Sequence, residues 1–299
     1  MSDLSPELAA IDDALSGIGG STSDYASLVQ TVSEQPATQT PLLELKRSII
    51  KAGIVCEGDN FERVLLARAM QESEPRIGEV PVHHSVKRLI RREFQRYGSP
   101  ASSGPPVLLG TDPFVAAAKI CTLRRFPSGP MDWVISGMPR SWFPRIPARR
   151  LIPVLRYIFS EFGGIKPAFY MHVAHPPRNR SLILSAEVKK SYYRMARSLA
   201  LQPEMKGIMC ASWLHDPSAL EDAPHLAVIN EPYLEWGGRI VTTLGPAPVE
   251  SGFLKFSPER RAKFERGELK LMTTLAMWPR RAALAWASDH PELDDAPEA

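Results

Sequence analysis

The chain has 299 residues, of which 44% are hydrophobic and 23% are charged, and 36 basic against 33 acidic side chains give a formal net charge of +3. This length exceeds one minimal domain and fits two, and the composition supplies enough apolar residues for a full core. The small net charge does not favour a protein that binds nucleic acid across its whole surface, although it leaves a local basic patch open.

Cysteine usage and the apolar runs indicate the compartment. Cys56, Cys121 and Cys210 are far apart, odd in number and without C-x-x-C spacing, so neither a disulfide framework nor a zinc ribbon is expected. The stretch MSDLSPELAAIDDALSG is acidic and lacks the basic and apolar regions of a signal peptide. No apolar run approaches the roughly eighteen residues of a membrane-spanning helix. We therefore expect a reduced, cytoplasmic protein with no membrane partner.

Helices are predicted throughout residues 1–98. Ser5 is a candidate N-cap with Pro6 at the first helical position, and Asp59 is placed to cap the helix DNFERVLLARAMQES. The segment HHSVKRLIRREFQRYG is strongly amphipathic and stops at Gly98. Two further helices, TSDYASLVQTVSEQ and LLELKRSIIKAGI, are predicted before it.

The stretch SPASSGPP, residues 99–106, is small, proline-rich and uncharged, which is typical of a domain boundary. In residues 107–288 strand-like segments (VLLG, MDWVISG, PAFYMHVA, GIMCASWL, RIVTTLG) alternate with helical ones (PARRLIPVLRYIFSEFGG, SAEVKKSYYRMARSLAL, SPERRAKFERG with Ser257 as cap). FVAAAKICTLRRF, KLMTTLAMW and RAALAWA fit strands or helices. The alternation predicts an α/β fold with a mixed sheet. The acidic tail, residues 289–299, is expected to fray.

Polar residues follow two strand-like segments of this domain. His172, His175, Arg178 and Arg180 end the first, and Ser212, Trp213, His215 and Asp216 end the second. Ligands of α/β sheets bind beyond the carboxyl ends of strands, so these residues form the first candidate site. A histidine beside a carboxylate serves as a general base near neutral pH. Ordinary loop and surface residues, with His172 partly buried, are the alternative.

The same residues also permit a metal site. His172, His175 and His215 or Asp216 would make a set of two histidines and one carboxylate. No H-E-x-x-H spacing on a helix supports this alternative.

A second candidate is ISGMPRSWFPRIPARR, residues 135–150. Trp142 and Phe143 stand among four arginines there: Arg140, Arg145, Arg149 and Arg150. Basic and aromatic side chains together suit a phosphate-bearing or nucleotide-like ligand. A solvated loop with one buried tryptophan is the alternative, and it is slightly favoured.

A third candidate is the helix VKRLIRREFQR, whose basic side chains fall mostly on one side: Lys87, Arg88, Arg91, Arg92 and Arg96. Such a face suits a partner protein or nucleic acid, but it is more often a solvated surface. His83 and His84, just before it, are expected to be exposed. G-x-G-x-x-G, G-x-x-x-x-G-K-[ST] and G-x-S-x-G are absent, so dinucleotide, P-loop and α/β-hydrolase chemistry lose their usual signatures.

In the order of its predicted elements, about 120 residues of the α/β part resemble the GNAT acyltransferases. AFYMHVA corresponds to the strand, HPPRNRS to the loop, SAEVKKSYYRMARSLAL to the helix and GIMCASWLHDP to the next strand. The loop lacks the glycines of that family's Q/R-x-x-G-x-G/A motif. The resemblance implies an acyl-coenzyme A donor, whose pyrophosphate would contact Arg178, Asn179, Arg180 and Ser181, and a small-molecule amine acceptor.

Three functional hypotheses follow. In the leading one, an acyl group moves from a thioester to an amine, with His215 taking the amine proton, Asp216 assisting it and His172 as a third catalytic candidate. Backbone N–H groups of the strand AFYMHVA would polarise the thioester carbonyl. In the second, the domain is a non-catalytic binding or scaffold module whose basic helix, residues 82–97, contacts a partner or nucleic acid. In the third, the protein is a metal-dependent enzyme using His172, His175 and His215.

Overall fold

The computed structural model of the protein describes residues 6–18, 25–34, 40–98, 106–173, 185–248, 254 and 257–295. The chain divides into two compact units, one formed by residues up to Val80 with His84–Pro127, and the other by Pro81–His83 with the chain from Ser128 onward. The division therefore follows Pro127, whereas the sequence places a boundary at 99–106. Of that predicted boundary, only position 106 belongs to the described residues.

The described part of the first unit is mainly helical. Its elements are α1 (Pro6–Ile18), α2 (Tyr25–Glu34), α3 (Thr40–Lys51), α4 (Asn60–Ser73), the 3-10 helix η2 (Glu74–Gly78), α5 (His84–Gly98), α6 (Asp112–Cys121) and the short strand β1 (Arg125–Pro127). Helix α2 packs on α4 and α6, and the buried side chains Val29, Leu65 and Phe114 come from these three helices. Pro6 begins α1 and Gly98 ends α5, as predicted.

Two local predictions in this unit are wrong. VLLG forms no strand. The following FVAAAKIC is helical and belongs to α6, whose N-cap Thr111 accepts a hydrogen bond from the Phe114 N–H. Asp59 precedes α4 but does not cap it. Its carboxylate instead accepts hydrogen bonds from Arg63 Nε at 2.8 Å and from the Val107 N–H at 2.9 Å. A charged partner and a distant backbone N–H replace the local cap.

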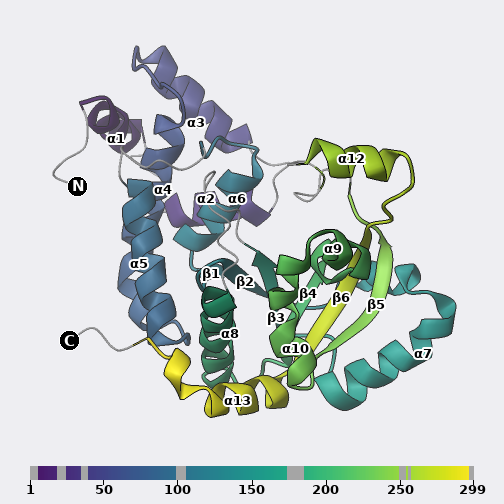
Figure 1. Ribbon diagram of the computed structural model, residues 1–299. Helices are drawn as coiled ribbons and strands as arrows, with labels where there is room; N and C mark the ends of the chain where they lie inside the picture. The colour runs from purple at the N-terminus through teal and green to yellow at the C-terminus, as the bar shows by residue number, and fades with distance from the viewer. Residues whose placement is uncertain are drawn as a thin grey trace. The chain divides into compact units, whose positions relative to one another are not determined.

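The second unit contains most of a six-stranded mixed sheet with strand order β1-β2-β3-β4-β6-β5 (Figure 1). After β1, the strands are β2 (Met131–Ser136), β3 (Ala168–Val173), β4 (Gly207–Ser212), β5 (Arg239–Pro246) and β6 (Met272–Pro279). Strands β3 and β4 are parallel, and the pairs β2–β3, β4–β6 and β5–β6 are antiparallel. The chain is thus a mixed α/β protein, as the alternation of segments predicts.

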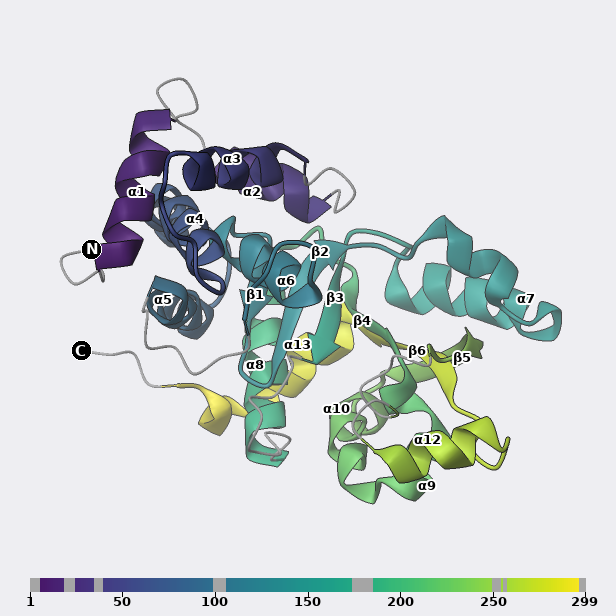
Figure 2. The same ribbon diagram turned by 90° about the horizontal axis from the view of Figure 1, so that it is seen from above.

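Helices cover both faces of this sheet (Figure 2). Helices α8 (Ser185–Ala200) and α13 (Arg280–Asp289) lie on one face, where Tyr192, Trp278 and Trp286 are buried. On the other face, α7 (Ala148–Tyr157) and the π-helical turn η4 (Ile158–Phe162) pack over Met209, Leu275 and Met277. Residues that alternate along a strand point to opposite faces, so each strand contributes to both cores.

Short elements complete the second unit. They are the 3-10 helices η3 (Arg140–Arg145), η5 (Trp213–His215), η6 (Pro224–Ile229) and η7 (Pro291–Leu293) and the helices α9 (Pro217–Asp222), α10 (Glu231–Glu235) and α12 (Pro258–Glu265). Ser257 caps α12 by accepting from the Arg260 N–H, as predicted. RAALAWA is helical and belongs to α13. The described start of the acidic tail is held in place, since Arg194 donates to Asp295 at 2.9 and 2.6 Å.

Among the described helices, none combines the length and apolar character that crossing a membrane requires.

Candidate functional site

A pocket of about 360 Å³ opens in the second unit at the carboxyl end of β4, beside Tyr170 of β3. It lies on the α7 side of the sheet, because Tyr170 and Ala211, which line it, pack against the core of that side. The lining residues are Trp142, Arg145, Tyr170, Ala211, Ser212, Trp213, Leu244, Pro248 and Thr273. This position is where α/β sheets commonly bind ligands.

The helix η3 contributes two side chains to the pocket. Side chains three residues apart eclipse each other in a 3-10 helix, so Trp142 and Arg145 face the same way. Prolines at 139 and 144 favour this short irregular turn over a regular helix. The other arginines of the predicted cluster, Arg140, Arg149 and Arg150, are exposed and do not line the pocket.

Strand β3 contributes Tyr170 to the pocket. His172, two residues further along, is on the same face of the strand but is not among the lining residues. The Tyr170 ring is 5.9 Å from that of Trp142 and 4.7 Å from that of His172, measured between centroids. The Tyr170 hydroxyl donates to the Ala211 carbonyl at 3.4 Å. Burial raises the pKa of this phenol above its ordinary value, so the hydroxyl stays neutral. His172 therefore lies beside a ring that lines the pocket.

The pairing between β3 and β4 is short. It comprises the residue pairs Phe169–Ile208 and Tyr170–Met209, although β3 continues to Val173 and β4 to Ser212. The pocket begins where this described pairing ends, with Tyr170 on one strand and Ala211 and Ser212 on the other. Two parallel strands and the pocket at their ends thus form one structural feature.

Asp132 is a residue that the sequence interpretation missed. It is buried in β2 and is the register partner of His172 across the β2–β3 pair. Directly opposite residues of an antiparallel pair have their side chains on the same face, with Cβ atoms about 5 Å apart. The available signal was an acidic residue inside the strand-like segment MDWVISG, since a buried carboxylate in a strand is rare unless it has a specific role.

His215 has a different environment from His172. Its ring is fully buried, with its centroid 5.8 Å from that of Tyr233. Its Nδ1 atom lies 2.5 Å from Oδ1 of Asn230. Because Oδ1 accepts, Nδ1 carries the proton, and Nε2 has no hydrogen-bond partner among the described residues. Burial lowers the pKa of His215 to about 4, so the ring is neutral at neutral pH. His215 is not among the residues that line the pocket.

Asp216 joins two elements. Its Oδ1 atom accepts from the Ser218 N–H at 2.8 Å and so caps α9, while its Oδ2 accepts from the Met272 N–H at 2.8 Å. His215 and Asp216 are adjacent in the sequence, but their side chains point into different surroundings. The structure therefore does not bring the predicted pair together at the pocket.

The predicted donor-binding residues Arg178, Asn179, Arg180 and Ser181, and also His175, lie outside the described residues. Of the first candidate site, the structure describes His172, Ser212, Trp213, His215 and Asp216. Of these, Ser212 and Trp213 line the pocket. The helix α8 begins at Ser185, directly after residues 174–184, which the structure does not describe.

Within the described residues, the histidines do not converge as the metal alternative requires. His172 contacts Tyr170 on the α7 face of β3, whereas His215 contacts Tyr233, whose hydroxyl lies 3.9 Å from the sulfur of Met171 on the opposite face. The contacts of the two rings therefore lie on opposite faces of the sheet.

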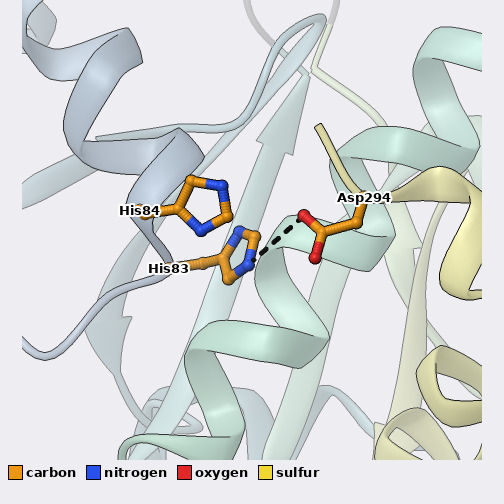
Figure 3. Close-up of side chains that lie close together, drawn as sticks. All are labelled: His83, His84 and Asp294. Carbon is orange, nitrogen blue, oxygen red and sulfur yellow. Dashed lines mark ion pairs between the residues drawn. The ribbon is translucent and has the colours of Figure 1, made fainter. Parts of the chain in front are cut away.

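His83 is buried rather than exposed as predicted. Its Nε2 atom lies 3.5 Å from a carboxylate oxygen of Asp294 (Figure 3), and its backbone N–H donates to Ser198 Oγ at 3.0 Å. These contacts join His83 to Asp294 and to α8, which accounts for the burial of its side chain.

Comparisons of the chain with protein-family models, with curated proteins and with solved structures found no match.

Proposed function

We propose that the second unit transfers an acyl group from a thioester donor of the coenzyme A class to a small-molecule amine. The observation that carries this proposal is the pair of parallel strands β3 and β4, which pair over two residues and then border a pocket between Tyr170 of β3 and the carboxyl end of β4. Helix α8 connects these strands, and β5 and β6 follow as closing antiparallel strands. This order agrees with the resemblance to the GNAT acyltransferases.

The part of the pocket that is lined by small side chains suits the thin arm of a thioester carrier. Small side chains line it where β4 ends and β6 begins, namely Ala211, Ser212 and Thr273. Arg178 and Arg180 stand shortly before the start of α8, and guanidinium groups and the N–H groups of a helix start both bind pyrophosphate. Backbone N–H groups of β3 would polarise the thioester carbonyl.

His172 is the residue that we propose as the general base. It takes one proton from the attacking amine while the new carbon–nitrogen bond forms and the carbon–sulfur bond breaks. The sulfur leaves as a thiolate and becomes the thiol when it takes up a proton from the protonated His172 or from water. Its position supports this role, since it follows Tyr170 on the pocket face and has Asp132 opposite it. A carboxylate beside a histidine orients the ring and stabilises its protonated form. His215 is less suited, because a fully buried ring with a pKa of about 4 accepts a proton poorly at neutral pH.

Donor binding is tested by thermal-shift and calorimetric titration of the full chain with coenzyme A and acetyl-coenzyme A. We expect a concentration-dependent rise in melting temperature, because a ligand that binds only the native state stabilises it by about 2.7 kcal/mol at a hundredfold excess over Kd. The variant R178A/R180A should bind at least about tenfold more weakly. The variant R47A/R76A removes the same charge from two exposed positions of the first unit and should bind as the parent does.

Failure of both carriers to bind would remove the proposal, and equal losses in the two double variants would reduce it to general charge attraction. The catalytic step is followed by thiol release with a panel of amines. We expect His172→Ala to lower kcat by about a hundredfold or more, and His225→Ala, at an exposed histidine, to leave it unchanged.

A further inference from the structure

Three aromatic rings from three elements line the pocket: Trp142 from η3, Tyr170 from β3 and Trp213 from η5. All three side chains are half-buried, so part of each ring remains accessible. The rings of Trp142 and Tyr170 are inclined by 53° and therefore do not stack flat on each other. Aromatic walls of this kind bind planar apolar groups.

Arg145 carries the only charge among the described residues that line the pocket. The described residues include no carboxylate in an ion pair with it. The side chain is exposed, and its guanidinium lies over Gly245 of β5, since a Cβ placed on this glycine would lie 3.6 Å from Nη2 and 4.0 Å from Nε. Gly245 has a φ of +112°, which side-chain-bearing residues rarely adopt, so the glycine leaves β5 as a bare backbone surface beneath the guanidinium.

These features define the charge of the ligand. A guanidinium fork binds a carboxylate through two parallel hydrogen bonds. A polyamine or another polycation would find no countercharge among the lining residues that the structure describes, which are neutral except for Arg145. One arginine balances a single negative charge, whereas a phosphate ester carries nearly two, so a carboxylate fits better.

We propose that the pocket binds the acceptor as an aromatic amino carboxylate, a molecule with a planar ring, one carboxylate and a primary amine, as in the aromatic α-amino acids. The ring lies among Trp142, Tyr170 and Trp213, and the carboxylate binds Arg145. The amine is left at the ends of β3 and β4, on the face that carries His172. Calling this ligand the acceptor depends on the proposed acyl transfer, but its binding does not.

Binding is measured on the full chain without a donor, by calorimetry and by tryptophan fluorescence, since Trp142 and Trp213 both line the pocket. The probes are phenylalanine, tyrosine and tryptophan. Each is compared with its carboxamide, which keeps the ring and amine but loses the carboxylate, and with leucine and putrescine, which lack the ring. We expect saturable binding of the aromatic amino acids and a loss of at least about tenfold for the carboxamides.

The variant R145A should lose the preference for the acid over its carboxamide, and R145K should keep only part of it, because lysine lacks the planar fork. R140A is the matched control, since Arg140 belongs to the same 3-10 helix and does not line the pocket, and it should bind as the parent does.

Equal binding of acids and carboxamides, preferred binding of putrescine, or an unchanged R145A would overturn the assignment. So would failure of all three aromatic acids to bind. If coenzyme A binds and the aromatic acids do not, acyl transfer stands and this acceptor class is wrong. If the aromatic acids bind through Arg145 and coenzyme A does not, the pocket assignment stands and acyl transfer is wrong.

Discussion

His172 lies near the end of β3, and His215 follows the neighbouring strand β4. The two side chains nevertheless have different surroundings. His172 is half-buried on the pocket face of β3. His215 is enclosed by Tyr233 and Asn230. Because solvation decides whether an imidazole can accept a proton near neutral pH, these two environments give the two rings different chemistry. A histidine is therefore assigned a role from its neighbours in space.

The burial of His215 predicts a dependence of stability on pH. Its pKa is about 4 in the folded chain against 6.5 for an ordinary histidine, so the unfolded chain binds the proton first as the pH falls. The contribution of neutral His215 to the free energy of unfolding is fully present above about pH 6.5. This contribution, roughly 3 kcal/mol, is lost as the pH falls toward about 4. Urea unfolding at a series of pH values measures this loss.

The comparison for this experiment is His215→Gln, which should show a shallower decline of unfolding free energy with falling pH. His225→Gln changes an exposed histidine and should follow the parent chain. A decline that is the same in all three proteins would show that other groups cause it.

At the scale of elements, β4 and β6 approach each other closely at Gly207. This residue pairs with Pro279 and has a φ of +152°. A Cβ there would lie 2.2 Å from the Trp278 carbonyl oxygen and 2.8 Å from Cε2 of Phe162. The sheet and the turn η4 can therefore pack together only with a glycine at this position.

We expect Gly207→Ala to destabilise the second unit by more than about 3 kcal/mol, because it combines backbone strain with overpacking against a carbonyl. Gly267→Ala is the matched control, with a φ of +74° and no atom within 4 Å of the new Cβ; it should cost only about 1 kcal/mol. Unfolding curves followed by circular dichroism measure both. Similar losses would mean that the backbone conformation alone accounts for Gly207.

Element boundaries show which sequence signals are sufficient. Ser257 followed by Pro258 starts α12, and Pro6 starts α1, as predicted, because capping and proline act within one turn of chain. Asp59 has the same type of local signal but bonds to Arg63 and Val107. Val107 is far along the chain, so no local pattern could reveal that competition.

Over the whole molecule the basic and acidic side chains are nearly equal in number. Two basic side chains of helix α5 contact residues close to them in the chain. Lys87 Nζ donates to the Gly78 carbonyl at 2.6 Å, and Arg96 pairs with Glu93 at 2.7 Å. Val86, Ile90 and Phe94 on the other side of the helix are buried. That this face is a solvated helix surface and not a nucleic-acid interface stays a prediction.

We therefore expect no saturable binding of labelled duplex DNA or single-stranded RNA at physiological salt. Fluorescence anisotropy at low and physiological salt measures it, with R91E/R92E as the variant, since both arginines are exposed. Tight binding that falls steeply with salt and disappears in the variant would favour the binding-module alternative.

Local sequence patterns were sufficient to predict the class of fold. Hydrophobic periodicity located β2, β3, β4 and β5 and the helices α7 and α8, because these patterns depend on residues within a few positions of each other. It also drew attention to the carboxyl ends of two strands and to the Trp142–Arg145 segment, where the pocket lies.

Which of those residues share a site depends on contacts between segments that are distant in the sequence. The register of β2 on β3 sets Asp132 opposite His172, and the short pairing of β3 with β4 leaves room beside Tyr170. Asn230, fifteen positions along the chain, holds the His215 ring inside the core. Strand register and burial arise from contacts between distant segments, and a single sequence records residue types without recording those contacts.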